Sequence, residues 1–492
     1  MAASTAIPAA AQPSSRSARW ALALTPIAFL MVTLDALVVI TALPAVHREL
    51  GASLSTLEWT VNAYTLAYAA GIITAAALGD RFGRRRMFTI GLVLFSAASA
   101  ACALAPTVGL LIAFRVIQGL GAAIIMPLSL TILTAAFPPE RRGAIIGLWG
   151  GIGGLAVAAG PLVGGAITQG LDWHWIFWVN VPIGLVAAVL SFAFLSESYG
   201  PATRLDLPAV GLVSAGALGL VWGLVRAGDS GWGDRQTLVS LAVGLLLLAG
   251  FVAWERRAPE PMLPLRLFRS TTFAAANATG FLMVAALFGA AFLTAQYFQL
   301  GLGFSPLGTG VRILPWTATP ILVAPAAGVL SDRIGRRPVM VAGMLLQAVG
   351  LGWFALEVST SVGYGQLVLP LLVAGVGVSM ALAATPTAVL SAVAPADMGK
   401  ASGANSTFQR FGSVFGVAVA TAVFAANGHL GTAASFTAGF RPALAVLASL
   451  SLLGVLPALA VRARKGLPAP ARAEASLVAA ADFQAITEGI AS

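Results

Sequence analysis

Stretches of about 20 apolar residues, the length that a helix needs to cross a lipid bilayer, recur along almost the whole chain. No other feature limits the fold as strongly. Hydrophobic residues make up 58% of the chain and charged residues only 9%, whereas soluble domains carry about 25% charged residues. The sequence therefore predicts an all-α polytopic membrane protein. The net charge of +10 is then a matter of membrane topology and does not indicate a nucleic-acid partner.

Fourteen apolar windows lie between charged or Pro/Gly-rich breaks, which predicts 14 transmembrane helices. They cover residues 20–44, 58–78, 87–105, 108–134, 144–168, 176–195, 207–226, 236–254, 272–299, 309–330, 338–357, 366–391, 404–427 and 441–463. Residues 1–19 are small, polar and unpatterned, and residues 464–492 carry no motif, so both ends are interpreted as tails. A signal peptide is the alternative for the N-terminus, but the apolar run after it is too long and holds Asp35.

Basic residues gather on one side of these windows. With the N-terminus in the cytoplasm, 21 of the 28 Lys and Arg residues fall in cytoplasmic segments, four at or near the outside and three within spans. Cytoplasmic loops carry the excess of positive charge in membrane proteins. Both termini are therefore predicted to be cytoplasmic. A composition rich in Ala, Gly and Arg favours a bacterial cell (inner) membrane.

The two ends of the chain resemble each other. "LGDRFGRRRM" at 78–87 returns as "LSDRIGRRPV" at 330–339, and "GLGAA" at 119–123 returns as "GVGVS" at 375–379. These matches predict two six-helix pseudo-repeat bundles, 20–195 and 272–463, with two extra helices in the linker 196–271. Tandem six-helix halves with a binding site at their interface are typical of transporters.

Asp35 and Arg115 are charged residues inside apolar windows. Asp35 lies nine residues before Pro44, and Arg115 lies seven residues after Val108. At about 1.5 Å per residue both fall roughly 10–14 Å below the outer surface, so we expect an ion pair or a shared water network. Such a pair could load and release a proton, because burial disfavours the ionised carboxylate and a nearby arginine favours it. The alternative is a static pair that only orders the helices. Gln118 shares the helical face of Arg115 and could bind substrate or the arginine.

The repeated Gly-Arg loops are interpreted as cytoplasmic latches that break and re-form during transport. The residues assigned to them are Asp80, Arg81, Gly83, Arg84 and Arg85 in the first loop and Asp332, Arg333, Gly335 and Arg336 in the second. The alternative, a purely topological role for the positive charge, would need the arginines but not the fixed aspartate and glycine.

The window 144–168 is rich in glycine. Gly160 and Gly164 have the small-xxx-small spacing that lets helices approach closely, Gly165 follows, and Pro161 removes one backbone hydrogen bond. We expect a seal against a helix of the other half. Ordinary tight packing is the alternative.

Further polar residues are candidates for the substrate-binding wall. They are Asn62, Tyr64, Gln296, Tyr297 and Arg312, with Trp59 and Gln299 as additional wall positions. Interfacial anchoring explains Trp59 equally well, and Arg312 and Arg410 could reach the membrane surface.

Five motifs carry a family resemblance. "GDRFGRRR", "RVIQGLGAA" and "AAGPLVGG" resemble signature motifs of the major facilitator superfamily, and "LDALVVITALP" and "WHWIFWVNVPIG" are similar to its fourteen-helix drug:proton antiporter branch. His174 departs from the arginine that is more common in the family, and "FQRFG" at 408–412 departs from the usual Arg-Gln order. The resemblance implies a proton-driven exporter of small lipophilic drugs or antibiotics, with the Pro161 helix accompanying antiport. Because dication exporters often carry an acidic residue near the position of Arg312, a neutral or anionic substrate is expected.

Other functions fit less well. A symporter or uniporter importing a small metabolite is the main alternative, and the Gly160-Pro161 pair argues against it. An enzyme is not expected, because the longest internal loop has about 17 residues and no Walker motif is present. A single cysteine, Cys102, and three histidines provide no metal-ligand spacing, so no metal or cofactor is expected. We expect a monomer whose partners are the lipid bilayer, protons and a small lipophilic substrate.

Overall fold

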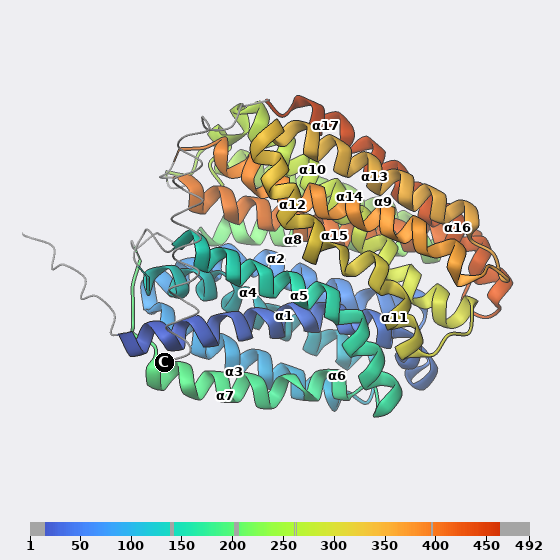
Figure 1. Ribbon diagram of the computed structural model, residues 1–492, viewed down its shortest axis with the longest axis horizontal. Helices are drawn as coiled ribbons and strands as arrows, with labels where there is room; N and C mark the ends of the chain where they lie inside the picture. The colour runs from blue at the N-terminus through green and yellow to red at the C-terminus, as the bar shows by residue number, and fades with distance from the viewer. Residues whose placement is uncertain are drawn as a thin grey trace, which may run out of the picture.

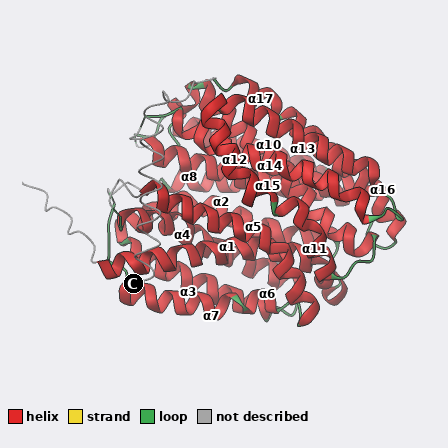
Figure 2. Ribbon diagram, viewed as in Figure 1, coloured by secondary structure: helices red, strands yellow, loops and turns green. Residues whose placement is uncertain are grey.

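The computed structural model describes residues 15–137, 142–200, 206–259, 261, 263–394 and 397–462. Every secondary-structure element within these ranges is a helix (Figure 2). The all-helical prediction is therefore confirmed for the described part of the chain.

The first half of the molecule, α1 to α7, packs as one bundle (Figure 1). It consists of α1 (Ser15–Leu50), α2 (Leu54–Phe82), α3 (Arg84–Ala103), α4 (Val108–Ala135), α5 (Arg142–Gly170), α6 (Trp175–Trp178) and α7 (Asn180–Phe194). Two further helices follow, α8 (Leu207–Ser230) and α9 (Arg235–Glu255). α8 contacts both α2 of the first half and α15 of the second, while α9 packs on α8.

The second half packs as another bundle, above the first in Figure 1. It consists of η2 (Leu265–Arg269), α10 (Thr271–Gln296), the π-helix η3 (Tyr297–Gly301), α11 (Pro306–Thr317), α12 (Thr319–Ile334), α13 (Arg336–Glu357), α14 (Tyr364–Ser391), α15 (Met398–Asn427), α16 (Ala433–Leu453) and α17 (Val455–Ala460). The halves meet along two seams, α2 against α15 and α5 against α11.

The number of spans differs from the prediction. Among the described residues 12 helices are long and apolar enough to cross a membrane, and up to 13 with the bent pair Leu54–Ile72 and Thr74–Phe82 taken as one span. The apolar part of α5 that this test covers, Leu155–Gly170, is shorter than a span. Fourteen spans are therefore not confirmed.

The two Gly-Arg turns have the same backbone geometry. α2 ends at Gly83 with φ 104°, and α12 ends at Gly335 with φ 95°. Each glycine separates two helices that are otherwise continuous in sequence. A positive φ in this range favours glycine, because a Cβ atom would be strained there. Both turns lie at the same end of the molecule, called here the basic end; the opposite end, where α1 and α5 finish, is the far end.

The N-terminal boundary of the first bundle is earlier than predicted. α1 begins at Ser15 rather than near Trp20. Tertiary contacts extend the helix: the Arg16 guanidinium lies 4.8 Å from the Phe194 ring centre, and Ser17 Oγ accepts a hydrogen bond from the backbone N–H of Ser196 at 3.0 Å. The predicted tail thus holds at least one structured turn.

Candidate functional site: a buried polar network around Asp35

Asp35 and Arg115 form an ion pair within the first bundle. Asp35 lies in α1 and Arg115 in α4, and each residue is only 1% exposed. Arg115 Nη1 lies 2.5 Å from Asp35 Oδ2. A charge buried alone in this setting would be costly, so the two groups compensate each other.

Two amide side chains complete the surroundings of the carboxylate. Asp35 Oδ1 accepts hydrogen bonds from Gln118 Nε2 and from Asn180 Nδ2, both at 2.8 Å. Ser99 Oγ on α3 accepts from the same two amides, at 2.6 Å from Gln118 and 3.1 Å from Asn180. Both oxygens of Asp35 therefore accept hydrogen bonds, as an ionised carboxylate requires. Four helices, α1, α3, α4 and α7, supply the group.

The guanidinium of Arg115 is held from several sides but keeps one free donor. Its Nε donates to the Thr60 carbonyl at 3.0 Å and its Nη1 donates to Gln118 Oε1 at 2.7 Å. The ring of Tyr64 lies under it, 4.1 Å from ring centre to guanidinium carbon. Within the described part of the chain, the buried Nη2 has no hydrogen-bond partner. A donor in this position can bind an oxygen atom of another molecule.

The residues predicted from sequence divide into two groups. Asp35, Arg115, Gln118 and Tyr64 meet in this network. Asn180 and Ser99 belong to it as well but were not identified from sequence. Asn180 stands as a single amide within an apolar window, and intramembrane polar residues are functional candidates by default, so a signal for it was present.

Two other predicted wall residues make contacts within the second half. Gln296 donates to the Phe292 carbonyl of its own helix at 3.0 Å. Tyr297 donates to the Ser359 carbonyl at 2.6 Å and stacks on Phe440 in the aromatic core of the second half. Neither of them is brought to the Asp35 network.

Arg312 is held at the far end. Its Nη1 donates to the Gly308 carbonyl at 3.1 Å, and its guanidinium lies 4.0 Å from the Phe304 ring centre and 5.3 Å from that of Tyr364. These contacts lie within the second half. Gln299 does cross between the halves, because its Nε2 donates to the Thr41 carbonyl at 2.8 Å.

A second buried carboxyl, Glu58, was also not identified from sequence. It lies in α2 and is 1% exposed. Asn62 Nδ2 donates to Glu58 Oε1 at 3.0 Å, which accounts for Asn62. Glu58 Oε2 is hydrogen-bonded to the hydroxyl of Thr421 in α15. Glu58 is the first residue of the apolar window 58–78, and the sequence pattern does not distinguish a buried carboxyl at this position from a polar helix boundary.

Comparison with known proteins identifies the family. The model of the Major Facilitator Superfamily matches residues 26–318 and 281–487. The chain belongs to the major facilitator superfamily. It is 39% identical to the tetracenomycin C resistance and export protein of Streptomyces glaucescens over 394 residues, which cover 79% of this chain and 73% of that protein. It is 37% identical to the multidrug resistance protein Stp of Mycobacterium tuberculosis over 404 residues, 82% of this chain and 75% of that protein.

The relatives include a further resistance protein, and the solved structures agree on the fold. The methylenomycin A resistance protein of Streptomyces coelicolor is 32% identical over 394 residues, 79% of this chain and 82% of that protein. A bacterial homologue of the lysosomal transporter Spinster superposes with a TM-score of 0.68 at 15% identity, covering 93% of this chain and 100% of that one. The protein is thus a multi-pass membrane transporter related to drug and antibiotic resistance exporters, and not an enzyme.

The first Gly-Arg turn of this superfamily member is tied to a segment that sequence reasoning did not assign. Arg84 Nη2 lies 2.7 Å from Asp80 Oδ1. Glu197, which follows α7, accepts the backbone N–H of Arg85 at 2.9 Å, and its carboxylate would be 2.7 Å from a Cβ atom at Gly83. The Glu197 contacts join the turn to the segment that directly follows α7, and neither they nor the Arg84–Asp80 pair involves the second half.

The remaining charged residues of the predicted latches are more exposed to solvent. Arg81, Asp332 and Arg333 are exposed, whereas Arg336 is half-buried. In the second half, Arg266 and Asp397 form a bidentate salt bridge at the basic end. Arg266 donates two hydrogen bonds to the Asp397 carboxylate, at 2.7 and 3.0 Å.

The glycine-rich helix of this transporter touches helices of both halves. Gly160 and Gly164 face α1, where a Cβ atom on either would overlap Leu37 or Thr41. On the other side, a Cβ atom at Gly165 would overlap the Pro306 carbonyl of α11. A Cβ atom at Gly310 of α11 would likewise overlap the Pro161 carbonyl.

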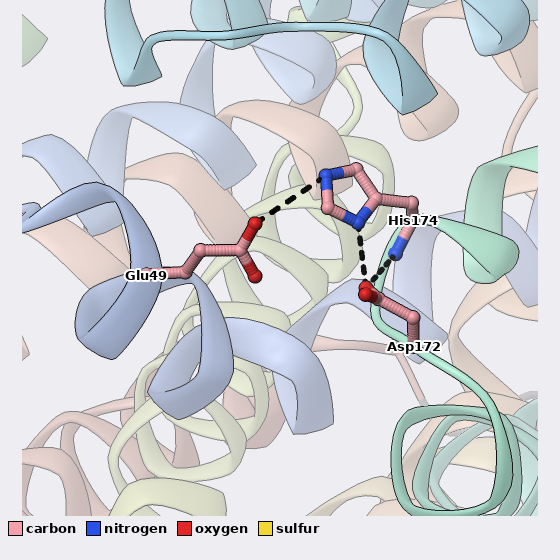
Figure 3. A group of neighbouring side chains, drawn as sticks. All are labelled: Glu49, Asp172 and His174. Carbon is pink, nitrogen blue, oxygen red and sulfur yellow. Dashed lines mark hydrogen bonds and ion pairs between the residues drawn. The ribbon is translucent and has the colours of Figure 1, made fainter.

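A second group of titratable side chains lies at the far end. Glu49, Asp172 and His174 offer ligand atoms within 4.8 Å of one another (Figure 3), although no metal spacing was found in the sequence. Hydrogen bonds account for the arrangement: His174 Nδ1 lies 2.6 Å from Asp172 Oδ1, and Trp173 donates to Glu49 at 2.7 Å. Burial raises the pKa of Asp172, but the hydrogen bonds from His174 outweigh it, so the pKa is lowered below its usual value. The group joins the end of α1 to the loop before α6.

Proposed function

We propose that the protein is a proton-driven exporter of small lipophilic drugs or antibiotics that alternates access between its two halves. The observation that carries the proposal is the Asp35–Arg115 pair, buried at the centre of a four-helix polar network. The similarity to a resistance and export protein and to a multidrug resistance protein supports the direction of transport.

Proton coupling follows from the cost of separating the pair. Removing one partner of a buried ion pair costs about 3–5 kcal/mol, because it leaves an uncompensated charge. Movement of Arg115 away from Asp35 is therefore favourable only when Asp35 takes up a proton. Return of Arg115 expels that proton, and the free Nη2 of Arg115 gives an oxygen atom of a neutral or anionic substrate a place to bind. Gln118, Tyr64 and Asn62 on α4 and α2 are proposed to contribute to the same site.

The membrane arrangement is part of the proposal. Fourteen spans, with α2 and α5 each counted as one, place both termini in the cytoplasm of a bacterial cell, and the basic end then faces the cytoplasm as topology rules require. The Gly-Arg turns act as cytoplasmic latches, and α5 seals the outer end against α11. The protein acts as a monomer in the cell membrane.

Transport into inverted membrane vesicles tests the coupling. A panel of lipophilic antibiotics and dyes is offered with and without an imposed pH gradient, to wild type, Asp35→Asn and the control Asp234→Asn, which changes a carboxylate outside the spans. We expect gradient-driven uptake in wild type and the control, and a loss of at least about tenfold in Asp35→Asn, since one lost coupling interaction of 1.4 kcal/mol is already tenfold.

Two results would contradict the proposal. Asp35→Asn that accumulates substrate as well as wild type, at equal expression, would make Asp35 structural. Wild-type movement of substrate in the same direction as the proton gradient would favour the symporter or uniporter that imports a small metabolite.

A further inference from the structure

Glu58 lies on the seam between the two halves, near the outer end of α2. Its partner Thr421 belongs to α15 of the second half and is also buried, at 4% exposure. The hydrogen bond between Glu58 Oε2 and the Thr421 hydroxyl therefore holds the halves together directly. The members of the Asp35 network, in the described part of the chain, all belong to the first half instead.

The number of hydrogens at this contact depends on the charge of Glu58. The Thr421 hydroxyl carries one hydrogen, yet three acceptors are in reach: Glu58 Oε2, the Val417 carbonyl at 3.0 Å and the Ala418 carbonyl at 3.1 Å. An ionised Glu58 competes with the two carbonyls for this hydrogen. A protonated Glu58 instead donates its own hydrogen to the Thr421 oxygen and leaves the hydroxyl free to donate to a carbonyl.

The seam around Glu58 is apolar and closed on the side of the extra helices. Trp59 packs against Trp222 of α8 with ring centres 5.7 Å apart. Val221, Val225 and Val414 form a buried cluster beside Trp59. Burial of an ionised carboxylate in such surroundings is unfavourable compared with its neutral form.

Charged groups on three of the helices that surround α2 make contacts of their own. Arg115 of α4 is paired with Asp35 of α1. Arg226 of α8 lies 2.9 Å from Asp234. The guanidinium of Arg410 on α15 lies 4.4 Å from the Tyr68 ring centre, and it stands 11 residues, or about 16 Å along the helix, before Thr421.

We propose that Glu58 is a second proton-binding carboxyl of the transport cycle. When α2 and α15 separate at the outer end, water reaches Glu58 and the carboxyl is ionised. Closing the seam takes one proton from the outside water and forms the O–H bond that donates to Thr421. The return of the empty carrier to its inward-facing state therefore requires an external proton. The inference rests on the proposed function, in which the halves alternate.

Distance measurements between the halves test this inference. Spin labels are attached to Ser55→Cys and Ala426→Cys, at the outer ends of α2 and α15, in the full chain reconstituted in liposomes. The native Cys102 is fully buried. As pH falls, we expect the population with the short distance to increase relative to the population with the long distance. For a single proton this ratio changes by up to about tenfold per pH unit. Glu58→Gln, which resembles the neutral form, should show the short distance at every pH.

Two further variants keep the test decisive. Thr421→Val retains the carboxyl but removes its acceptor, so the transition should move to lower pH; this variant also serves if Glu58→Gln does not fold. Asp35→Asn should lose coupled transport yet keep the pH-dependent distance, which separates this inference from the proposed function.

The proposal is overturned by any of three results. They are a pH response in Glu58→Gln equal to that of wild type, a response that vanishes in Asp35→Asn but persists in Glu58→Gln, and a wild-type distance that does not change with pH.

Discussion

Asp35 shows how a carboxylate can be kept inside a membrane helix. One oxygen receives the guanidinium of Arg115, and the other receives amide hydrogens from Gln118 and Asn180. Hydrogen bonds to a charged group each contribute about 1.5–3 kcal/mol, and their donors come from helices that are rigidly packed. The side chains of Arg115, Gln118 and Asn180 therefore stabilise the carboxylate, and a change in its charge alters contacts with both α4 and α7.

Asn180 is predicted to stabilise the protein through its hydrogen bond to the Asp35 carboxylate. Asn180→Leu should lower the free energy of unfolding by roughly 1.5–3 kcal/mol, because it removes a hydrogen bond to a carboxylate. In an Asp35→Asn background the loss should be less than half as large. Reversible unfolding in mixed micelles, read as a double-mutant cycle, measures this coupling.

A matched asparagine provides the control. Asn277 is buried in α10 and donates to the Phe273 carbonyl of its own helix at 2.9 Å, so Asn277→Leu should show no coupling to Asp35→Asn. A coupling of zero for Asn180 as well would mean that the amide only fills space.

At the scale of the element, α5 stands out because it packs closely on two sides. Gly160 and Gly164 pack against α1, and Pro161 and Gly165 pack against α11 of the other half. Backbones that approach this closely gain dispersion contacts over a long stretch. At Gly165 the neighbours are backbone atoms of Pro306 and Leu307, so a rotamer change cannot make room there for a larger side chain.

Gly310→Val is predicted to open the α5–α11 seam. The new side chain would overlap the Pro161 carbonyl, so we expect gradient-driven transport to fall at least about tenfold and proton leak through liposomes to rise. Gly328→Val, on the neighbouring α12, is the control because nothing lies within 4 Å of its added Cβ atom. Equal leak and transport in the two variants would show that close packing here does not seal the pathway.

At the scale of the whole molecule, the two halves share a helix pattern but not a charge pattern. The buried ion pair is in the first half, and in the corresponding helix of the second half Leu371 stands where the repeat aligns Arg115. The extra pair α8–α9 covers the α2–α15 seam, through Trp222 against Trp59. The seam that carries Glu58 is thus closed to lipid on the side where α8 lies.

Topology is the prediction that belongs to this scale. With fourteen spans and cytoplasmic termini, single cysteines at Ser53 and Gly233 should react with a membrane-impermeant maleimide on intact cells, whereas one at Arg86 should react only after permeabilisation. All three positions are exposed. The native Cys102 is buried and serves as the unlabelled background. Labelling of Gly233 only after permeabilisation would mean that α8 and α9 do not cross the membrane.

The sequence by itself determined what depends on the chain's own periodicity. Apolar windows indicate helices because the length of a bilayer crossing is constant, and Asp35 and Arg115 could be placed at one depth because the rise per residue is constant. The repeated glycines at 83 and 335 predicted equivalent turns, and both have a positive φ. The five motifs, in their order along the chain, were sufficient to predict the family.

Only the tertiary structure decided which side chains meet. Asn180 lies 145 residues from Asp35 and Thr421 lies 363 residues from Glu58, and whether such residues touch depends on how each helix is rotated about its axis. Helix rotation follows from packing against neighbours, which no window of one helix contains. For the same reason Tyr297 and Arg312, both plausible wall residues by composition, lie in an aromatic core and at the far end instead. The depth of a residue in the membrane depends on one helix alone, whereas the direction in which its side chain points depends on how that helix packs in the bundle.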